Sequence, residues 1–353
     1  MKAIIRNTCI VSVLLVLIVV GFYTVTEYRP KEVEPVIISG EGTRRLAEGD
    51  SIALLTWNTG FAALDGTRDF FMDGGTHGSA DNRETVQANV DGMIQTIASQ
   101  NCDIVFLQEV DTEAKRSFRI NMVDDFASSF GGTSSFAVNY KAAFVPVPLQ
   151  SPLGGVESGI QTLTSFPSED ASRIRLPNSY SWPVSTCQLK RCLLRQEIPL
   201  EGSDKKLILV NLHLDAYADD DQKAAQTNLL HNLVIEEYEK GNYVIAGGDF
   251  NQTIPGADSS LYPVLNDEYF QAPEIDASGL PEGFRYVCDD SVPTSRLLNE
   301  PYSHDWSTTQ LYVIDGFLLS PNVRLDRIET LNEEFRYTDH NPVRLEVTLL
   351  LQE

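Results

Sequence analysis

Residues 243–251 read YVIAGGDFN, an apolar run that ends in two glycines, an acid, an aromatic residue and an amide. The run Tyr243–Gly247 has the length and composition of a buried β-strand. Asp249 and Asn251 follow it directly. On their own they would be ordinary turn residues, because aspartate and asparagine beside glycine favour turns. Whether Asp249 and Asn251 have a functional role therefore depends on which residues lie at the ends of the other predicted strands.

Polar residues recur wherever other apolar runs stop. Further strands are predicted over 52–57, 103–110, 159–166, 193–199, 206–214, 311–319 and 343–350, and amphipathic helices over 83–100 and 224–239. The polar residues in or just beyond these strands are Asn58, Glu109, His213, Asp215, Asp315, Asp339 and His340. Strand ends that meet at one edge of a layered α/β fold converge on a crevice, where ligands bind. We therefore expect these side chains to gather in one site.

The alternation of strands and helices indicates one α/β domain over 51–353, with loop-rich insertions near 60–82 and 252–309. A chain of 353 residues often forms two domains, but layered α/β folds of about 250–300 residues form single units. The sequence shows no internal repeat and no low-complexity tract.

The first fifty residues do not share this pattern. Residues 1–7 carry Lys2 and Arg6, and 8–25 are almost wholly apolar. As a helix, 8–25 would rise about 27 Å, roughly one hydrocarbon core of a bilayer. The positive flank predicts a cytoplasmic N-terminus at 1–7, a transmembrane signal anchor over 8–25, and a C-terminal domain outside the cytoplasm. Residues 26–50 are polar and lack periodicity, which predicts a stalk or linker.

A cleaved signal peptide is the alternative to an anchor, and it would make the protein secreted. No small-x-small cleavage site follows the apolar run, which favours the anchor and attachment to the cell membrane through this helix. Export also allows disulfides. Cys187 and Cys192 are close enough for a local bridge, although spacing alone leaves that pairing open.

Acidic residues outnumber basic ones by 50 to 27, a formal net charge of −23. Such a charge argues against a general nucleic-acid binder, because duplex phosphates repel a surface without a large basic face. A local basic groove remains open, and its best candidate is a loose set of five residues: Arg173, Arg175, Lys190, Arg191 and Arg195.

Six short blocks occur in one order along the chain: Trp57-Asn58, Gln108-Glu109, Asn211-x-His213, Gly248-Asp249-x-Asn251, Asp315-Gly316 and Thr338-Asp339-His340. This set resembles the endonuclease/exonuclease/phosphatase superfamily, which includes DNase I-like nucleases, abasic-site endonucleases, inositol-polyphosphate phosphatases and sphingomyelinases. The resemblance spans nearly all of 51–345. It implies a four-layer α/β sandwich, with two mixed β-sheets packed face to face and helices outside. It also implies Mg²⁺-dependent hydrolysis of phosphoesters.

The resemblance further implies a metal site formed by Glu109, Asn58 and Asp339, which would hold Mg²⁺ or, in its place, Mn²⁺. Mg²⁺ prefers oxygen ligands and keeps several waters, so one or two carboxylates and a substrate phosphate are enough. The cation would neutralise charge that develops on the phosphoryl oxygens or on the leaving oxygen.

The catalytic residues implied by the resemblance are His340, Asp249, His213, Asn251 and Asp315. Asp315 beside His340 would orient the imidazole and raise its pKa. Either that pair or Asp249 would take the proton from the attacking water. Asn251 would position Asp249 or the phosphate, and His213 would donate to a non-bridging oxygen.

The substrate stays open among a small phosphodiester, a phosphorylated sugar, a lipid headgroup and nucleic acid. A DNase I-like endonuclease and a sphingomyelinase- or phospholipase C-like lipid phosphodiesterase are alternatives. For the second, Tyr140–Pro148 is the nearest match to a membrane-contacting hairpin, and it is predicted as a buried strand. A catalytically dead binding module is a further alternative, because a fold does not fix a function. The sequence indicates no protein partner.

Overall fold

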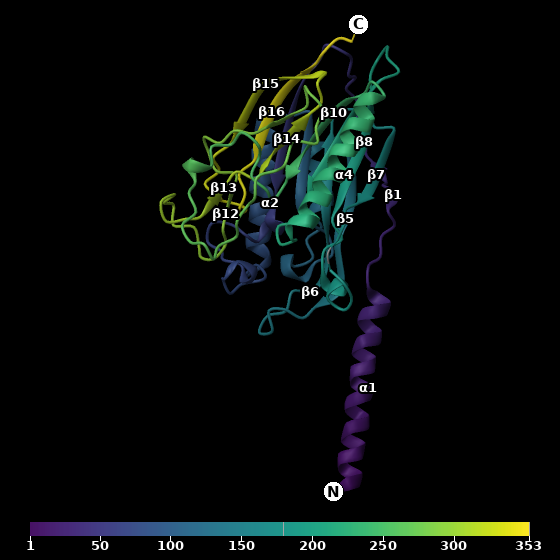
Figure 1. The fold of residues 1–353 in the computed structure, drawn as a ribbon, viewed down its shortest axis with the longest axis vertical. Helices are drawn as coiled ribbons and strands as arrows, with labels where there is room; N and C mark the ends of the chain where they lie inside the picture. The colour runs from purple at the N-terminus through teal and green to yellow at the C-terminus, as the bar shows by residue number, and fades with distance from the viewer. Residues whose placement is uncertain (179, 353) are drawn as a thin grey trace.

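The computed structural model describes residues 1–178 and 180–352, and its body consists of two stacked mixed β-sheets with helices outside (Figure 1). One sheet has the order β1 (Val33–Pro35), β7 (Asp170–Arg175), β8 (Cys192–Pro199), β9 (Lys206–His213), β10 (Tyr243–Asp249), β14 (Asp315–Leu319) and β11 (Arg285–Val287). The other has the order β15 (Val323–Thr330), β16 (Val343–Leu349), β3 (Ser51–Asn58), β4 (Ile104–Asp111), β6 (Gly154–Thr164), β5 (Thr133–Val145) and β2 (Ile38–Ser39).

The alternating side chains of the strands produce three apolar layers. In β10, Tyr243 and Ile245 face the core between the two sheets, and Val244 and Ala246 face helix α4 (Asp220–Glu239). On the far side, Leu55 and Val105 of the second sheet pack with helix α2 (Arg83–Gln100) and helix α3 (Met122–Phe130). The layers therefore run helix, sheet, sheet, helix, which confirms the predicted four-layer sandwich.

Local sequence explains the helix boundaries. The Asn82 side chain accepts a hydrogen bond from Thr85 N–H and begins α2, and Asn101, in the left-handed conformation, ends it. The Asp219 side chain accepts from Gln222 N–H and begins α4, four residues before the predicted start at 224. The first turn of α4 is polar, so the apolar periodicity begins only after the helix does.

The predicted strand over 311–319 is two strands. Leu311–Tyr312 forms β13, which pairs with β12 (Ser295–Arg296), and β14 begins at Asp315 and pairs with β10. Between them the carbonyls of Val313 and Ile314 accept hydrogen bonds from the loop after β10. This break turns the chain from a small separate sheet into the main one, and it places Asp315 at a strand start.

The N-terminal region differs from the prediction beyond its apolar helix. Helix α1 (Lys2–Thr26) is exposed along its length, and within the described residues it is the one helix apolar and long enough to cross a membrane. The predicted linker over 26–50, however, contains β1, which pairs with β7, and β2, which pairs with β5. These strands have two or three residues, too few to produce a periodic pattern. The segment thus lies along the domain and is not a free stalk.

The cysteines are unpaired in the structure, Cys187 and Cys192 included. Cys192 is buried in β8, whereas the thiol of Cys187 points to the carbonyl of Phe144 at 3.5 Å. The two side chains belong to different packing clusters, so the local bridge that the spacing allows is not formed.

Removing the segment before residue 45 should therefore destabilise the domain. We expect a chain that begins at Arg45 to melt at least about 5 °C below one that begins at Glu27, since it lacks both edge strands. Differential scanning fluorimetry of the two chains measures this, and the chain from Glu27 is the control because it also lacks α1. Equal melting temperatures would show that β1 and β2 contribute nothing to stability.

Candidate active site

Three adjacent strands place three predicted residues in one row. β10 lies between β9, to which it is parallel, and β14, to which it is antiparallel. In this register Asp249 stands opposite His213 on one side and opposite Asp315 on the other. The residue before Asp249 is Gly248, with φ of 147°, and a Cβ there would lie 2.0 Å from the carbonyl oxygen of Leu212. Only glycine lets the strands approach this closely.

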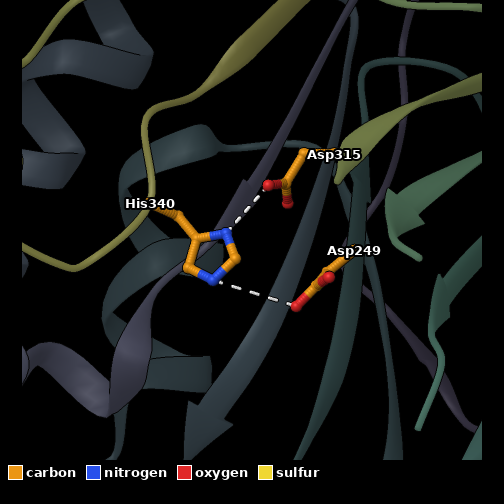
Figure 2. Close-up of side chains that lie close together, drawn as sticks. All are labelled: Asp249, Asp315 and His340. Atoms are coloured by element: carbon orange, nitrogen blue, oxygen red, sulfur yellow. Dashed lines mark hydrogen bonds and ion pairs between the residues drawn. The ribbon is translucent and has the colours of Figure 1, made fainter. Parts of the chain in front are cut away.

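His340 completes the row from the loop before β16. Its Nδ1 lies 2.8 Å from Asp315 Oδ2, and its Nε2 lies 3.9 Å from Asp249 Oδ2 (Figure 2). Ser295 Oγ lies 3.3 Å from the same Nε2. The buried Trp57 holds the loop, because its indole Nε1 donates to the carbonyl of His340 at 2.9 Å. The imidazole is therefore positioned by the hydrophobic core as well as by Asp315.

Asp249 is the centre of the hydrogen bonding. Its Oδ2 accepts from Asn58 Nδ2 at 3.0 Å and from Asn251 Nδ2 at 3.2 Å, and it lies 3.3 Å from His213 Nε2. Its Oδ1 accepts from Asn251 N–H at 2.9 Å. Asn251 Nδ2 also donates to the carbonyl of Leu214 at 2.9 Å, so this amide links the Asp249 carboxylate to the backbone just after β9.

Glu109 reaches the site through an irregularity in β4. The pairing of β4 with β6 shifts register between Leu107 and Val110, and Glu109 adopts a left-handed φ of 54°. Thr59 holds this strained turn, since its hydroxyl lies 3.0 Å from the carbonyls of both Gln108 and Glu109. Such bulges beside sites re-aim a side chain. Here the bulge places Glu109 Oε1 3.3 Å from Asn58 Nδ2.

Two residues of the sequence blocks join the two sheets beneath this site. The amide of Gln108 in β4 donates to Asn211 Oδ1 in β9 at 2.8 Å. Asn211 Nδ2 in turn donates to the carbonyl of Gln161 in β6 at 2.8 Å. Both amides are buried. Because they are hydrogen-bonded within the protein, they fix the spacing between the sheets and do not face a ligand.

Burial and charge set the protonation states. Burial, and then repulsion from Asp315, raise the pKa of Asp249 to about 7. Burial lowers the pKa of a histidine, but Asp315, Asp339 and Asp249 outweigh that effect and raise the pKa of His340 to about 10. Burial, with the positive charges of Arg191 and His340, holds the pKa of His213 well below its usual range. His213 is thus neutral and His340 is an imidazolium.

The donor set fits a divalent cation. Burial raises the pKa of both Glu109 and Asp339. The charge of Arg116 opposes this rise for Glu109 and the charge of Asp339 adds to it, whereas His340 and Arg296 oppose the rise for Asp339. Asp339 lies beside Gly60, where a Cβ would lie 2.8 Å from Asp339 Oδ1. Asp249, Asp315 and His340 also form a compact group, with ligand atoms within 4.8 Å of one another. An imidazolium has no free lone pair, so the carboxylates fit the cation better than His340 does.

Asn58 links the two carboxylates of the site. Its Oδ1 accepts from Gly60 N–H at 3.0 Å, and its Nδ2 donates to Glu109 and Asp249. The amide oxygen has a second lone pair, so the role of Asn58 as a metal ligand stays a prediction.

One side of a cavity of about 520 Å³ is lined by Asn58, Glu109, His213, Asp249, Asn251, Asp339 and His340. Asp315 is not part of the lining and contacts the cavity only through His340. It also contains Asp215 and three arginines: Arg191, which belongs to the predicted basic set, and Arg116 and Arg296, which the sequence did not single out. Arg116 forms a two-fold ion pair with Asp111, at 2.8 and 3.0 Å, and lies 3.7 Å over the ring of Phe61. Arg191 Nη1 donates to the carbonyl of His213 at 3.3 Å. No signal would have found Arg116, because a lone arginine in a loop is common.

The loose basic set does not form a groove. Arg173 is buried against backbone carbonyls, Arg195 pairs with Glu197 and Glu237, and Lys190 lies 3.4 Å from Glu27. Arg175 is paired with Glu32. Of the five residues, only Arg191 lines the cavity.

The fold is an α/β sandwich, and a cluster of acids, amides and imidazoles lies where the central strands of its two sheets end. The chain belongs to the Endonuclease/Exonuclease/phosphatase family, whose sequence model matches residues 55–340. Members of this family are generally phosphoester hydrolases, and they commonly use divalent metals. No curated protein sequence matches the chain.

Solved structures share the fold at low sequence identity. The endonuclease/exonuclease/phosphatase from Beutenbergia cavernae DSM 12333 is 14% identical, with a TM-score of 0.56 over 85% of this chain and 72% of that one. The Bacteroides thetaiotaomicron family protein is 15% identical, with a TM-score of 0.53 over 86% and 100%. Truncated TDP2 of Caenorhabditis elegans is 18% identical, with a TM-score of 0.50 over 85% and 98%. At such identities the likeness concerns the fold alone.

Asp315 should control the protonation of His340. We expect Asp315→Asn to return the pKa of the His340 ring from about 10 towards its usual range, because the charge that stabilises the imidazolium is lost. Histidine ring NMR titration of the metal-free protein measures this for five histidines. Ser295→Ala is the control, since it removes an uncharged neighbour of the same ring. A His340 pKa that is unchanged in Asp315→Asn would contradict the ion pair.

Proposed function

We propose that this protein is a Mg²⁺-dependent phosphoester hydrolase, of the phosphodiesterase or phosphatase type, that attacks phosphorus with an activated water. The observation that carries the proposal is the buried row His213, Asp249, Asp315 and His340 beside Glu109 at one end of the cavity. Membership of the family supports the same reaction class. Mn²⁺ would serve in place of Mg²⁺.

Glu109 and Asp339 would hold the cation, which when bound would supply positive charge to the phosphoryl oxygens and the leaving oxygen. Asn58 keeps Glu109 and Asp249 at a fixed separation through its amide N–H groups. Glu109 lines the cavity, and its carboxylate lies 4.0 Å from His213 Nε2.

Asp249 takes the proton from the attacking water, and Asn251 holds Asp249 in place. A base with a pKa near neutrality suits this task, and His340 is already protonated. His340, oriented by Asp315, donates from Nε2 to a phosphoryl oxygen. His213 is neutral, lies on the other side of Asp249, and donates a hydrogen bond to a non-bridging phosphoryl oxygen.

We further propose that α1 is an uncleaved membrane anchor. Its exposed apolar surface over Ile4–Thr26 would lie in the bilayer, and the basic residues Lys2 and Arg6 place the N-terminus in the cytoplasm. The catalytic domain then lies outside the cytoplasm at the cell membrane. N-terminal sequencing of the full-length protein from membranes tests this, because a cleaved signal would give a new N-terminus near residue 26.

Other functions are less well supported. A DNase I-like endonuclease needs a basic groove around its site, and four of the five candidate residues have protein partners. A catalytically dead binding module would not require the full set of hydrogen-bonded acids and imidazoles that this site contains.

Replacement of the row should abolish hydrolysis. We expect His340→Ala and Asp249→Asn each to lower Mg²⁺-dependent hydrolysis of bis-p-nitrophenyl phosphate by about 100-fold or more, because each removes a proton-handling group. Release of p-nitrophenolate measures the rate. His304→Ala is the control, since His304 is exposed and pairs loosely with Glu334. Wild-type protein that shows no metal-dependent turnover would favour the binding module.

Glu109 should determine the affinity for metal. We expect Glu109→Gln to raise the Mg²⁺ concentration for half-maximal rate by about tenfold or more, because it removes a charged oxygen ligand. The rise in melting temperature on adding Mg²⁺ should shrink in parallel. Glu113→Gln, exposed and four residues further along the chain, is the matched control. An unchanged metal dependence would place the cation elsewhere.

A further inference from the structure

The end of α1 is joined directly to the catalytic domain. α1 ends at Thr26, and the next residue, Glu27, already accepts a hydrogen bond from Ser185 Oγ at 2.7 Å in the short helix η4 (Val184–Cys187). Lys190 Nζ lies 3.4 Å from the same carboxylate. A few residues further on, β1 pairs with β7 and β2 pairs with β5. If α1 crosses a bilayer, no free linker separates the domain from its surface.

The part of the domain next to this junction is apolar and exposed. Phe144, Val147, Leu149, Trp182 and Val184, here called the apolar rim, are between 40% and 80% exposed. The segments that carry them, 142–156 and 180–189, contain no charged residue, in a chain in which 22% of residues are charged. α1 contacts both β5 and η4, and Cys187 contacts the carbonyl of Phe144, so the two segments lie together at the helix junction.

The sequence pattern predicted a buried strand over Tyr140–Pro148. The strand β5 ends at Val145, and the connection from β5 to β6 extends beyond it. In Figure 1 this connection is at the end of the domain from which α1 extends. The sequence pattern did not predict that this apolar connection is exposed and lies beside α1.

The apolar rim continues into the catalytic cavity. Val147 and Val184 belong both to the rim and to the cavity wall. Behind them the wall consists of Val145, Leu153 and Tyr140, which pack together, and it leads to Glu109 at the catalytic end. A cavity of about 520 Å³ with a largely apolar wall holds far more than a phosphate group.

From this arrangement we infer that the apolar rim docks onto the bilayer that holds α1, and that the substrate is a membrane phospholipid whose phosphodiester enters the cavity from that surface. This inference rests on the proposed function. The apolar wall accommodates the glycerol and upper acyl region, and the phosphate reaches Glu109 and Asp249. Because the rim is uncharged and the chain carries a net charge of −23, a zwitterionic headgroup fits this surface better than an anionic one.

The reaction adds one water across one ester bond. The water oxygen forms a bond to phosphorus, its proton passes to Asp249, and the bond between phosphorus and the diacylglycerol oxygen breaks. That oxygen takes up a proton and leaves as diacylglycerol, and the headgroup phosphate is released to water. No oxidant, reductant or second substrate is required.

Docking is tested without catalysis by tryptophan quenching. The full chain is reconstituted in phosphatidylcholine vesicles with and without brominated acyl chains. The chain has three tryptophans: Trp57 is buried, Trp182 is in the rim, and Trp306 is on the insertion that carries β12 and β13. We expect the bromolipid to quench the tryptophan fluorescence of the Trp306→Phe variant, which keeps Trp182. It should not quench that of the Trp182→Phe variant, which keeps Trp306. Equal quenching of the two variants, or none, would overturn the docking.

The substrate is tested in the same vesicles by release of phosphocholine from phosphatidylcholine. We expect Leu149→Glu and Phe144→Glu each to lower this release about tenfold or more, because a charge on the rim opposes entry into the headgroup region. Both should hydrolyse soluble bis-p-nitrophenyl phosphate within about twofold of wild type, since neither side chain lines the cavity. Leu261→Glu is the matched control and should change neither rate, because Leu261 is an exposed leucine on the 252–309 insertion with an exposed fraction between those of Phe144 and Leu149.

The two substrates separate the possible failures. Hydrolysis of the soluble diester without release of phosphocholine, or rim variants that lose both activities equally, would overturn this inference and leave the proposed function standing. Wild-type protein that hydrolyses neither substrate would overturn the proposed function and the lipid substrate with it.

Discussion

The structure depends on the packing of two buried carboxylates, Asp249 and Asp315, in adjacent strands, with a single imidazolium against them. Two buried carboxylates this close repel each other, and His340 is the group that compensates them. That compensation is possible because Gly248 lets the strands approach and because Trp57 fixes the loop of His340 from the core. The electrostatics of the site therefore depend on the packing of the sheets.

Sequence patterns predicted that these residues lie close together in the fold, for a physical reason. Asn58, His213 and Asp249 each end a buried strand, and strands paired in register bring their ends together. Glu109 lies within β4, and a bulge directs it to the same site. The interior strands are apolar enough to be recognised. α3, β7 and β15 were missed because they are short or carry charged residues on an exposed face, so neither length nor periodicity distinguishes them.

The remaining features come from contacts between distant segments. The cavity wall combines residues from the 60–82 insertion, from the β5–β6 connection and from the loop before β8. No single segment shows a pattern that would predict this enclosure. The strands β1 and β2 are equally invisible, since a strand of two or three residues acquires its identity only from the neighbour with which it pairs. Because β1 and β2 pair with the two sheets, the segment predicted as a linker is attached to the domain.

The side-chain nitrogen of Asn251 has a consequence for producing this protein. Asn251-Gln252-Thr253 is a sugar-acceptor sequence, and that nitrogen donates both to Leu214 and to Asp249. A eukaryotic secretory host attaches oligosaccharide to newly translocated chains before they fold. There, a glycan at Asn251 would occupy the space in which β9 and β10 end, so export through a route without such transferases suits this chain.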